Sequence, residues 1–334
     1  NKPRTPFEEH LFEACLYATN NGVAKVHFTI SKDHASMIQD LVGRCIDNLK
    51  SIYNIEIEIE YSNQISTTET VALDKKGSLV RIDGEILFRP AGHGALIENL
   101  NNINADIIFV KNIDNVVKEA LIADTVLYKK ALAGKLIKIV NEIHFLLDGL
   151  LNYPSEEVLN NSVNFIKTVL GVDLALEAKN LESKIHLVYQ YLNRPIRIAG
   201  MVKNDGEPGG GPFWVKDIKY GKSLQIVEEV QINKEDTEQH RILEASTHFN
   251  PVDLVCYVKN HKGNKFNLLK YVDQDAGLIA DKSVDGNSIK ILELPGLWNG
   301  AMADWITIFV EVPATTFNPV KTVFDLLKPS HQAD

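Results

Sequence analysis

The sequence predicts a mixed α/β fold in which helices cover the faces of a sheet. A strand over 26–30, a helix over 37–46 and a strand over 55–59 follow one another near the start. This β-α-β order is typical of parallel or mixed sheets. Strands return from Ile196 onward, after a long stretch with helical spacing of apolar residues. Strands at both ends of the chain therefore indicate one α/β core built from distant segments.

The first elements carry clear local signals. Thr5 can cap a helix whose first residue is Pro6, with acidic residues in its first turn. Isoleucine and glutamate alternate over 55–60, as in a half-buried strand. Turn residues are frequent between 62 and 88, including Asp83-Gly84, and they predict a small hairpin that decorates the sheet.

A glycine turn, Gly92–Gly94, opens a predicted helix at Ala95. A backbone without Cβ atoms can approach a ligand closely, and the helix start presents free N–H groups. This turn is therefore a candidate ligand site. A plain tight turn with His93 on the surface is the alternative.

A buried strand over 106–110 follows, and the polar residues 112–115 come directly after it. In open α/β sheets, ligands bind at the carboxyl ends of the strands. The carboxylate of Asp114 would suit a hard cation such as Mg²⁺, which shares its oxygen ligands with a substrate phosphate. Alternatively, Asp114 or Asn115 caps a helix that begins at Val116.

The next stretch is helical, with apolar residues at helical spacing and Ser155 as a cap. We expect residues 116–194 to form a helical insertion that serves in packing and in contacts between copies of a homo-oligomer. Residues 1–115 and 195–334 then form the α/β core.

Two loops rich in glycine and tryptophan interrupt the later strands over 196–202, 224–228, 254–257 and 306–312. They are Glu207–Trp214 and Leu294–Trp305. Tryptophan faces can bind sugar rings, and buried tryptophans in a loop-rich wall are the alternative.

Composition and charge exclude several classes of protein. An apolar fraction of 45% is that of an ordinary globular protein. The net charge of −9 argues against a surface for nucleic acid. Three scattered cysteines favour a reducing, cytoplasmic environment. No run approaches the ~20 apolar residues of a membrane helix.

Three motifs together resemble the UDP-sugar pyrophosphorylase family of nucleotidyltransferases. They are Pro90–Gly94, Phe109–Asn115 and Phe317–Leu327, the last of which is similar to an F-x-P-V-K-T-x-x-D-L-L segment. The sequence of the whole chain is more similar to a bacterial branch of that superfamily, which is described only as a domain of unknown function. The resemblance implies a Rossmann-like, GT-A-like sheet between helices. It also implies a Gly-rich phosphate loop upstream of Asn1, so we expect these residues to be the C-terminal part of a longer protein.

The resemblance assigns roles residue by residue. It implies that Asp114 binds Mg²⁺ and that Lys321 contacts a substrate phosphate, so we expect Lys321 to lie at the sheet edge near Asp114. The residues it implies for nucleotide binding are Gly92, His93, Gly94 and Asn112, and those for substrate binding are Glu228, Asn250, Asp253 and Glu293. Glu229, Pro251 and Asp253 depart from the family pattern, which favours either a different sugar or a structural role.

The implied reaction is attack of a sugar phosphate on the α-phosphate of a nucleoside triphosphate, which yields a nucleotide-sugar and pyrophosphate. A non-catalytic protein that binds a nucleotide-sugar or a sugar phosphate is the main alternative. An enzyme of another type acting on phosphosugars is the third, because a fold does not determine a function.

Overall fold

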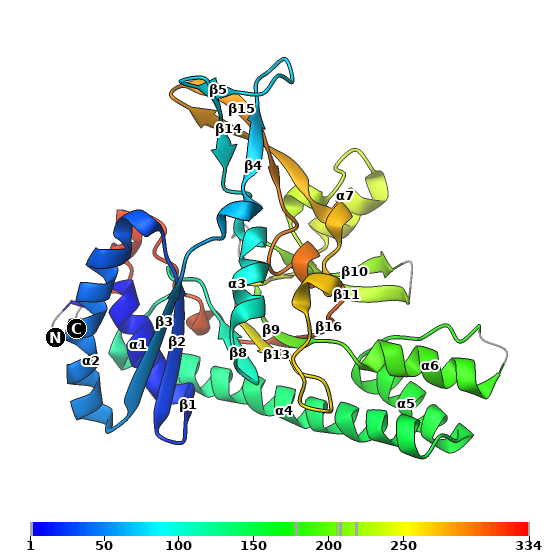
Figure 1. Cartoon of the computed structure of the whole chain (residues 1–334). Coiled ribbons are helices and arrows are strands. Elements are labelled where there is room, and N and C mark those ends of the chain that lie inside the picture. The colour runs from blue at the N-terminus through cyan, green and yellow to red at the C-terminus, as the bar shows by residue number, and fades with distance from the viewer. Residues whose placement is uncertain (1–2, 178–179, 205, 207–208, 218–219, 333–334) are drawn as a thin grey trace.

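The computed structural model describes residues 3–177, 180–204, 206, 209–217 and 220–332. It confirms a mixed α/β fold, with helices packed against several sheets (Figure 1). In the described part of the chain, the strands are divided among five sheets. None of the helices described is long and apolar enough to cross a membrane.

The first unit contains the predicted β-α-β order. Strands β2 (Val23–Thr29) and β3 (Glu56–Ser62) are parallel and joined by α2 (Ala35–Tyr53), while β1 (Thr19–Asn20) pairs with β2. Helix α1 (Pro6–Tyr17) packs against them, and the Thr5 hydroxyl accepts a hydrogen bond from the Glu8 N–H, as the cap signal predicts. These three strands form a sheet of their own.

The central sheet positions the candidate site. It contains β8 (Ile107–Val110), β13 (Leu254–Tyr257), β9 (Ile196–Lys203) and β16 (Ile306–Glu311), in that order, and β12 (His248–Phe249) pairs with the end of β9. Strand β13 is antiparallel to both neighbours, and β16 is parallel to β9. The carboxyl ends of β8, β9 and β16 therefore lie at the same edge as the start of β13.

Three helices lie between β8 and β9 in sequence: α4 (Ile122–Asn152), α5 (Glu156–Val169) and α6 (Leu181–Leu192) (Figure 1). The Ser155 hydroxyl accepts the Val158 N–H at 3.2 Å, as the predicted cap requires. Apolar residues at helical spacing on α4 share one core with the central sheet. Helix α4 therefore covers the sheet directly, and α5 and α6 pack against α4.

A second sheet, which we call the arm sheet, has the strand order β14-β15-β4-β7. Its strands are β4 (Thr70–Leu73), β7 (Phe88–Arg89), β14 (Leu278–Val284) and β15 (Asn287–Glu293). In Figure 1 the arm sheet stands away from the central sheet, at the top of the molecule. The predicted hairpin within 62–88 corresponds to two short strands beside it, β5 (Arg81–Ile82) and β6 (Glu85–Ile86). The hairpin of β14 and β15 is not predicted by the sequence analysis.

Several further elements lie in the sequence between the strands of these sheets. They are the turn η3 (His93–Ala95) with helix α3 (Leu96–Asn102), the paired strands β10 (Gly211–Asp217) and β11 (Gly221–Val227), and helix α7 (Thr237–Glu244). The prediction of a loop over Glu207–Trp214 is wrong from Gly211 onward, because Gly211–Trp214 are part of β10 and pair with β11. Glu207 and Pro208 lie outside the described residues.

Candidate functional site

Two predicted motifs, far apart in sequence, meet at the carboxyl edge of the central sheet. The Val320 N–H donates to the Asp114 carbonyl oxygen at 2.9 Å, and Asn115 forms an isolated β-bridge with Pro319. Asp114 follows β8, and the segment of Lys321 follows β16. The backbone of the predicted metal ligand thus lies beside that of the predicted phosphate-binding lysine.

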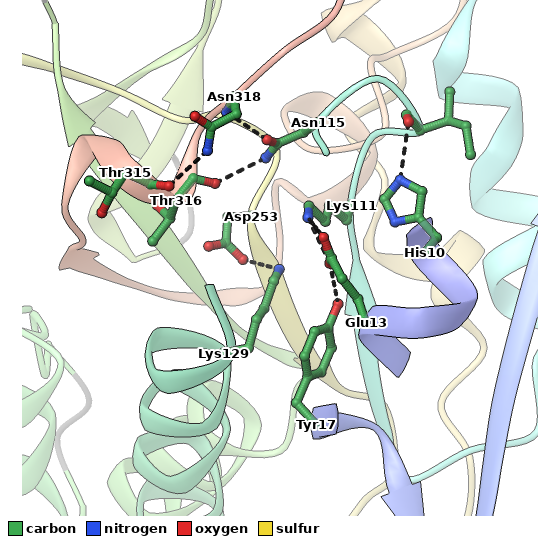
Figure 2. A network of polar contacts seen from close by, with 11 residues as sticks. His10, Glu13, Tyr17, Lys111, Asn115, Lys129, Asp253, Thr315, Thr316 and Asn318 are labelled. Atoms are coloured by element: carbon green, nitrogen blue, oxygen red, sulfur yellow. Dashed lines mark hydrogen bonds and ion pairs between the residues drawn. The ribbon is translucent and has the colours of Figure 1, made fainter. Parts of the chain in front are cut away.

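Buried Asn115 holds the two segments together (Figure 2). Its Oδ1 accepts the Asn318 N–H at 2.8 Å, and its Nδ2 donates to the Thr316 carbonyl at 3.3 Å. The alternative in which Asp114 or Asn115 caps a helix at Val116 is wrong. Residues 116–118 are not helical, and the first helical turn begins at Glu119. The Asn115 amide is instead used between segments.

The residues at this edge fit a shared metal site only in part. Asp114 is half-buried, and its carboxylate has no hydrogen bond or ion pair with a described residue, so it is available as a ligand. Within the described ranges, no three or more histidine, cysteine or acidic side chains gather to hold a metal. Mg²⁺ commonly takes one or two carboxylates and completes its shell with water and phosphate. Asp114 suits that arrangement.

Beside this edge, two buried ion pairs lie close together (Figure 2). The Lys111 ammonium is 2.7 Å from a carboxylate oxygen of Glu13, which also accepts the Tyr17 hydroxyl at 3.2 Å. Lys129 of α4 pairs with Asp253 at the start of β13. Burial lowers the pKa of Lys111, and burial followed by the Glu13 charge raises that of Tyr17. The four charges balance, which is the condition for keeping them inside.

Two predicted substrate residues thus make contacts within the protein. Asp253 is buried against Lys129, and Asn250 donates to the Gly200 carbonyl at 2.8 Å. The Asn250 Oδ1 accepts the N–H of Val252, which has a positive φ of 58°. A β-branched residue rarely adopts that conformation, so Asn250 supports a strained turn at the edge.

A second cluster forms where the glycine turn meets the segment after β15. The Leu294 N–H donates to the Ala91 carbonyl at 2.9 Å. A Cβ on Gly94 would lie 2.2 Å from the Pro295 carbonyl oxygen, so only glycine fits there. A Cβ on Gly92 would meet the Glu293 carboxylate at 3.4 Å. The glycine turn therefore lies close to the predicted substrate residue Glu293.

His93 is held on three sides in this cluster. Its ring stacks on Trp298, with centroids 4.1 Å apart, and its Nδ1 accepts the Leu297 N–H at 3.0 Å. Its Nε2 lies 3.6 Å from a carboxylate oxygen of Glu228. The contact with His93 lowers the pKa of Glu228. Since Nδ1 accepts, the neutral ring carries its proton on Nε2, toward Glu228.

Buried Arg197 supports this cluster through Trp298, and no sequence motif marks this residue. Its guanidinium donates to the Trp298 carbonyl and to the Thr307 hydroxyl, and it lies 3.4 Å from the Gln225 Oε1. Gln225 in turn donates to the Ala303 carbonyl at 2.6 Å. Burial lowers the pKa of Arg197 to about 10. These donors hold both ends of the segment that presents Trp298 to His93.

The two clusters are connected through the glycine run. The Asn250 N–H donates to the Gly210 carbonyl at 2.7 Å, and a Cβ on Gly210 would lie 3.6 Å from the Glu228 Cγ. Gly210 therefore links the sheet edge to the cluster around His93, which we call the histidine cluster. Asn112, the remaining predicted residue, accepts the Asn115 N–H through its carbonyl at 3.2 Å.

Fold and site together define a mixed α/β protein with a carboxylate and a lysine segment at one sheet edge and an aromatic, acidic cluster nearby. The chain belongs to the family described as a domain of unknown function, DUF4301, whose model matches residues 1–332. This confirms the predicted membership in a family of unknown function. None of the curated proteins matches the chain.

Among solved structures, the chain is similar to the UDP-glucose pyrophosphorylase of Leishmania major. Two mutants of that enzyme in complex with UDP-glucose match with 15% and 16% identity, and both have a TM-score of 0.44. The matches cover 96% and 91% of this chain, but only 57% and 53% of the enzyme chains. The chain thus spans little more than half the length of these structures.

Proposed function

We propose that the protein acts as a sugar-1-phosphate nucleotidylyltransferase on a Rossmann-like, GT-A-like fold. A phosphate oxygen of the sugar phosphate attacks the α-phosphate of a nucleoside triphosphate, a new P–O bond forms, and pyrophosphate leaves. No nucleophile of the protein takes part, so the protein acts through positioning and electrostatics.

The contact between Asp114 and Val320 supports this proposal most strongly. It brings an available carboxylate and a neighbouring exposed lysine, Lys321, to one sheet edge. A reaction between two phosphates needs cationic charge to offset their repulsion. Bound Mg²⁺, held by Asp114, would supply part of that charge. Lys321 would supply a point charge for a phosphate oxygen.

The histidine cluster supports binding of a polyhydroxyl group. Glu228 offers a carboxylate acceptor, and its lowered pKa keeps it ionised near neutral pH. Glu293 offers a second carboxylate, one oxygen of which lies 2.8 Å from the Lys282 ammonium. Carboxylates repel phosphate and accept hydrogen bonds from hydroxyl groups. We therefore propose that a ribose or sugar ring lies near Gly92–Gly94, with the phosphates toward Asp114.

The test measures pyrophosphate release by the full-length protein with Mg²⁺ across nucleoside triphosphates and sugar 1-phosphates. Asp114→Asn should lower turnover at least roughly a hundredfold, the scale of losing one preorganised charge contact. Asp47→Asn on the exposed surface of α2 is the matched control and should leave turnover unchanged. Near wild-type turnover by Asp114→Asn would remove Asp114 from the mechanism.

Lys321→Met keeps most of the apolar stem and removes the charge. It should cost about 1.5–3 kcal/mol of phosphate contact, or roughly tenfold to more than a hundredfold in kcat/KM. Lys130→Met, at an exposed position of α4, is the control. If nucleotide-sugar binds but no pyrophosphate is released with any substrate pair, the catalytic proposal fails and a binding function replaces it.

A further inference from the structure

The arm sheet presents an apolar row to solvent. Strand register places Ile279 opposite Leu292 and Val71 opposite Phe88. Leu292 and Val71 are adjacent across β15 and β4, because Ile291 pairs with Ala72 one residue away. Directly opposed residues point to the same face of a sheet. These four side chains, which we call the apolar row, therefore cross all four strands on one face.

The apolar row is exposed by large fractions. Ile279 is 63% exposed, Leu292 43%, Val71 37% and Phe88 52%. The opposite face of the same sheet is closed by a small core that includes Ala72, Ile289 and Ile291. The arm sheet therefore has an inner face that is packed in a core and an apolar outer face that is exposed to solvent. Contiguous exposed apolar side chains of this kind mark an interaction surface.

A second row beside it carries the charge pattern. Asp281 pairs with Lys290 and Lys290 with Leu73, and each of these three residues lies two positions along its strand from the apolar row. Leu73 also forms an isolated β-bridge with Leu79. Asp281 and Lys290 are exposed, and neither forms an ion pair with any residue the structure describes. The outer face thus bears one acid and one base side by side, with no net charge.

We propose that the outer face of the arm sheet binds the same face of a second copy of this chain. In a two-fold dimer, one patch meets itself. A two-fold axis that runs along the strands, between β14 and β15, places Ile279 over Leu292 of the second copy. The same axis places Asp281 over Lys290 of the second copy. Each charge then gains an opposite charge, and Ile279 and Leu292 each gain an apolar neighbour.

The charge pattern favours a second copy over other occupants. A strongly acidic or strongly basic partner would be attracted by one of these two charges and repelled by the other. Sheet faces also pack well on each other, about 10 Å apart, and the β14–β15 hairpin of a second copy has the same length and twist. Leu292 is directly followed by Glu293, which contacts the Gly92 turn. The dimer would therefore form next to the candidate site.

The test is the mass of the full-length protein by sedimentation velocity across micromolar concentrations. The wild type should form dimers, and Ile279→Arg should raise the dimer Kd by at least about tenfold. Phe145→Arg, on the exposed surface of α4, is the matched control and should leave the dimer unchanged. A monomeric wild type, or a dimer disrupted by Phe145→Arg but not by Ile279→Arg, overturns the proposal.

Charge swaps test the geometry itself. Asp281→Lys and Lys290→Asp should each be monomeric, because like charges then face one another between copies. An equimolar mixture of the two should form heterodimers, since every contact pairs lysine with aspartate again. Circular dichroism verifies that both variants are folded. Failure of two folded variants to associate when mixed overturns the predicted alignment of Asp281 with Lys290.

Discussion

The pKa of His10 is set by the residues around it. Its Nε2 lies 3.1 Å from the Ile113 carbonyl oxygen. Burial, and then the neighbouring Lys111 charge, lower its pKa from the ordinary 6.5 to about 4, against the opposing effect of Glu13. The imidazole is therefore neutral in the folded protein at pH values where it would be charged in an unfolded chain.

This shift predicts a pH dependence of stability. Between about pH 6.5 and pH 4 the unfolded chain binds the His10 proton more strongly than the folded protein does. The free energy of unfolding should therefore fall as the pH drops through this window. Urea unfolding at several pH values measures it. His10→Gln should flatten that slope, whereas the exposed His186→Gln should not. Equal slopes for wild type and His10→Gln would contradict the assignment.

Gly94 is the residue where backbone approach matters most. A methyl group there would lie 2.2 Å from the Pro295 carbonyl oxygen, which is backbone and cannot rotate away. We expect Gly94→Ala to destabilise the fold by about 1–3 kcal/mol, as overpacking does. Gly43→Ala, inside α2 with no heavy atom nearby, should instead stabilise by roughly 0.5–1 kcal/mol. Chemical denaturation of both variants decides, and a neutral Gly94→Ala would refute the close packing.

At the scale of elements, the buried pair of Glu13 and Lys111 joins α1 to the end of β8. Both side chains are nearly inaccessible to solvent, so removal of one leaves an uncompensated charge. The helix therefore depends on the sheet edge for its charge balance as well as for apolar packing.

Lys111→Met should cost about 3–5 kcal/mol, because the Glu13 carboxylate then remains buried and unpaired. The double variant Glu13→Leu with Lys111→Met should recover most of that loss. Lys25→Met breaks the exposed pair with Glu58 and serves as the control, with little effect on stability because solvent screens that pair. Urea unfolding of the wild type and the three variants measures these differences in stability. A small destabilisation by Lys111→Met would mean that water reaches the pair.

At the scale of the whole molecule, α4 connects two hydrophobic cores. Ile122, at its start, belongs to the core of the first unit, and Leu136 and Ile143 belong to the core of the central sheet. A single helix that is buried in two cores should make them unfold together.

All three tryptophans, Trp214, Trp298 and Trp305, lie in the second half of the chain. Their fluorescence reports on that half, whereas far-UV circular dichroism reports on the whole fold. We expect the two probes to give coincident urea transitions. An earlier transition seen by circular dichroism alone would show that the first unit unfolds by itself.

The sequence predicts the local elements well, because their signals are local. Thr5 and Ser155 cap the helices they precede, and the apolar run at Ile107–Val110 is a strand, although only Ile108 in it is fully buried. The β14–β15 hairpin is missed, although Asp285-Gly286, with φ of 49° and 78°, is a typical two-residue turn. The Asp285-Gly286 turn is therefore a sequence signal from which the hairpin could have been predicted.

Buried charges leave a weaker signal in the sequence. Lys129 lies at helical spacing with Leu132 and Leu136 on the buried face of α4. A lysine at a core position indicates a buried partner, but it does not say which acid supplies the partner. Arg197, inside a strand, has the same ambiguity.

By itself, the sequence determined the mixed α/β class, the order of the elements and the motifs around Gly92, Asp114 and Lys321. Only the tertiary structure decided how the strands divide among sheets and which segments meet. Periodicity records whether a side chain is buried, but it does not record the neighbour that buries it. The contacts of Asp114 with Val320 and of His93 with Glu228 join segments far apart in the chain, so they arise only when the whole chain packs.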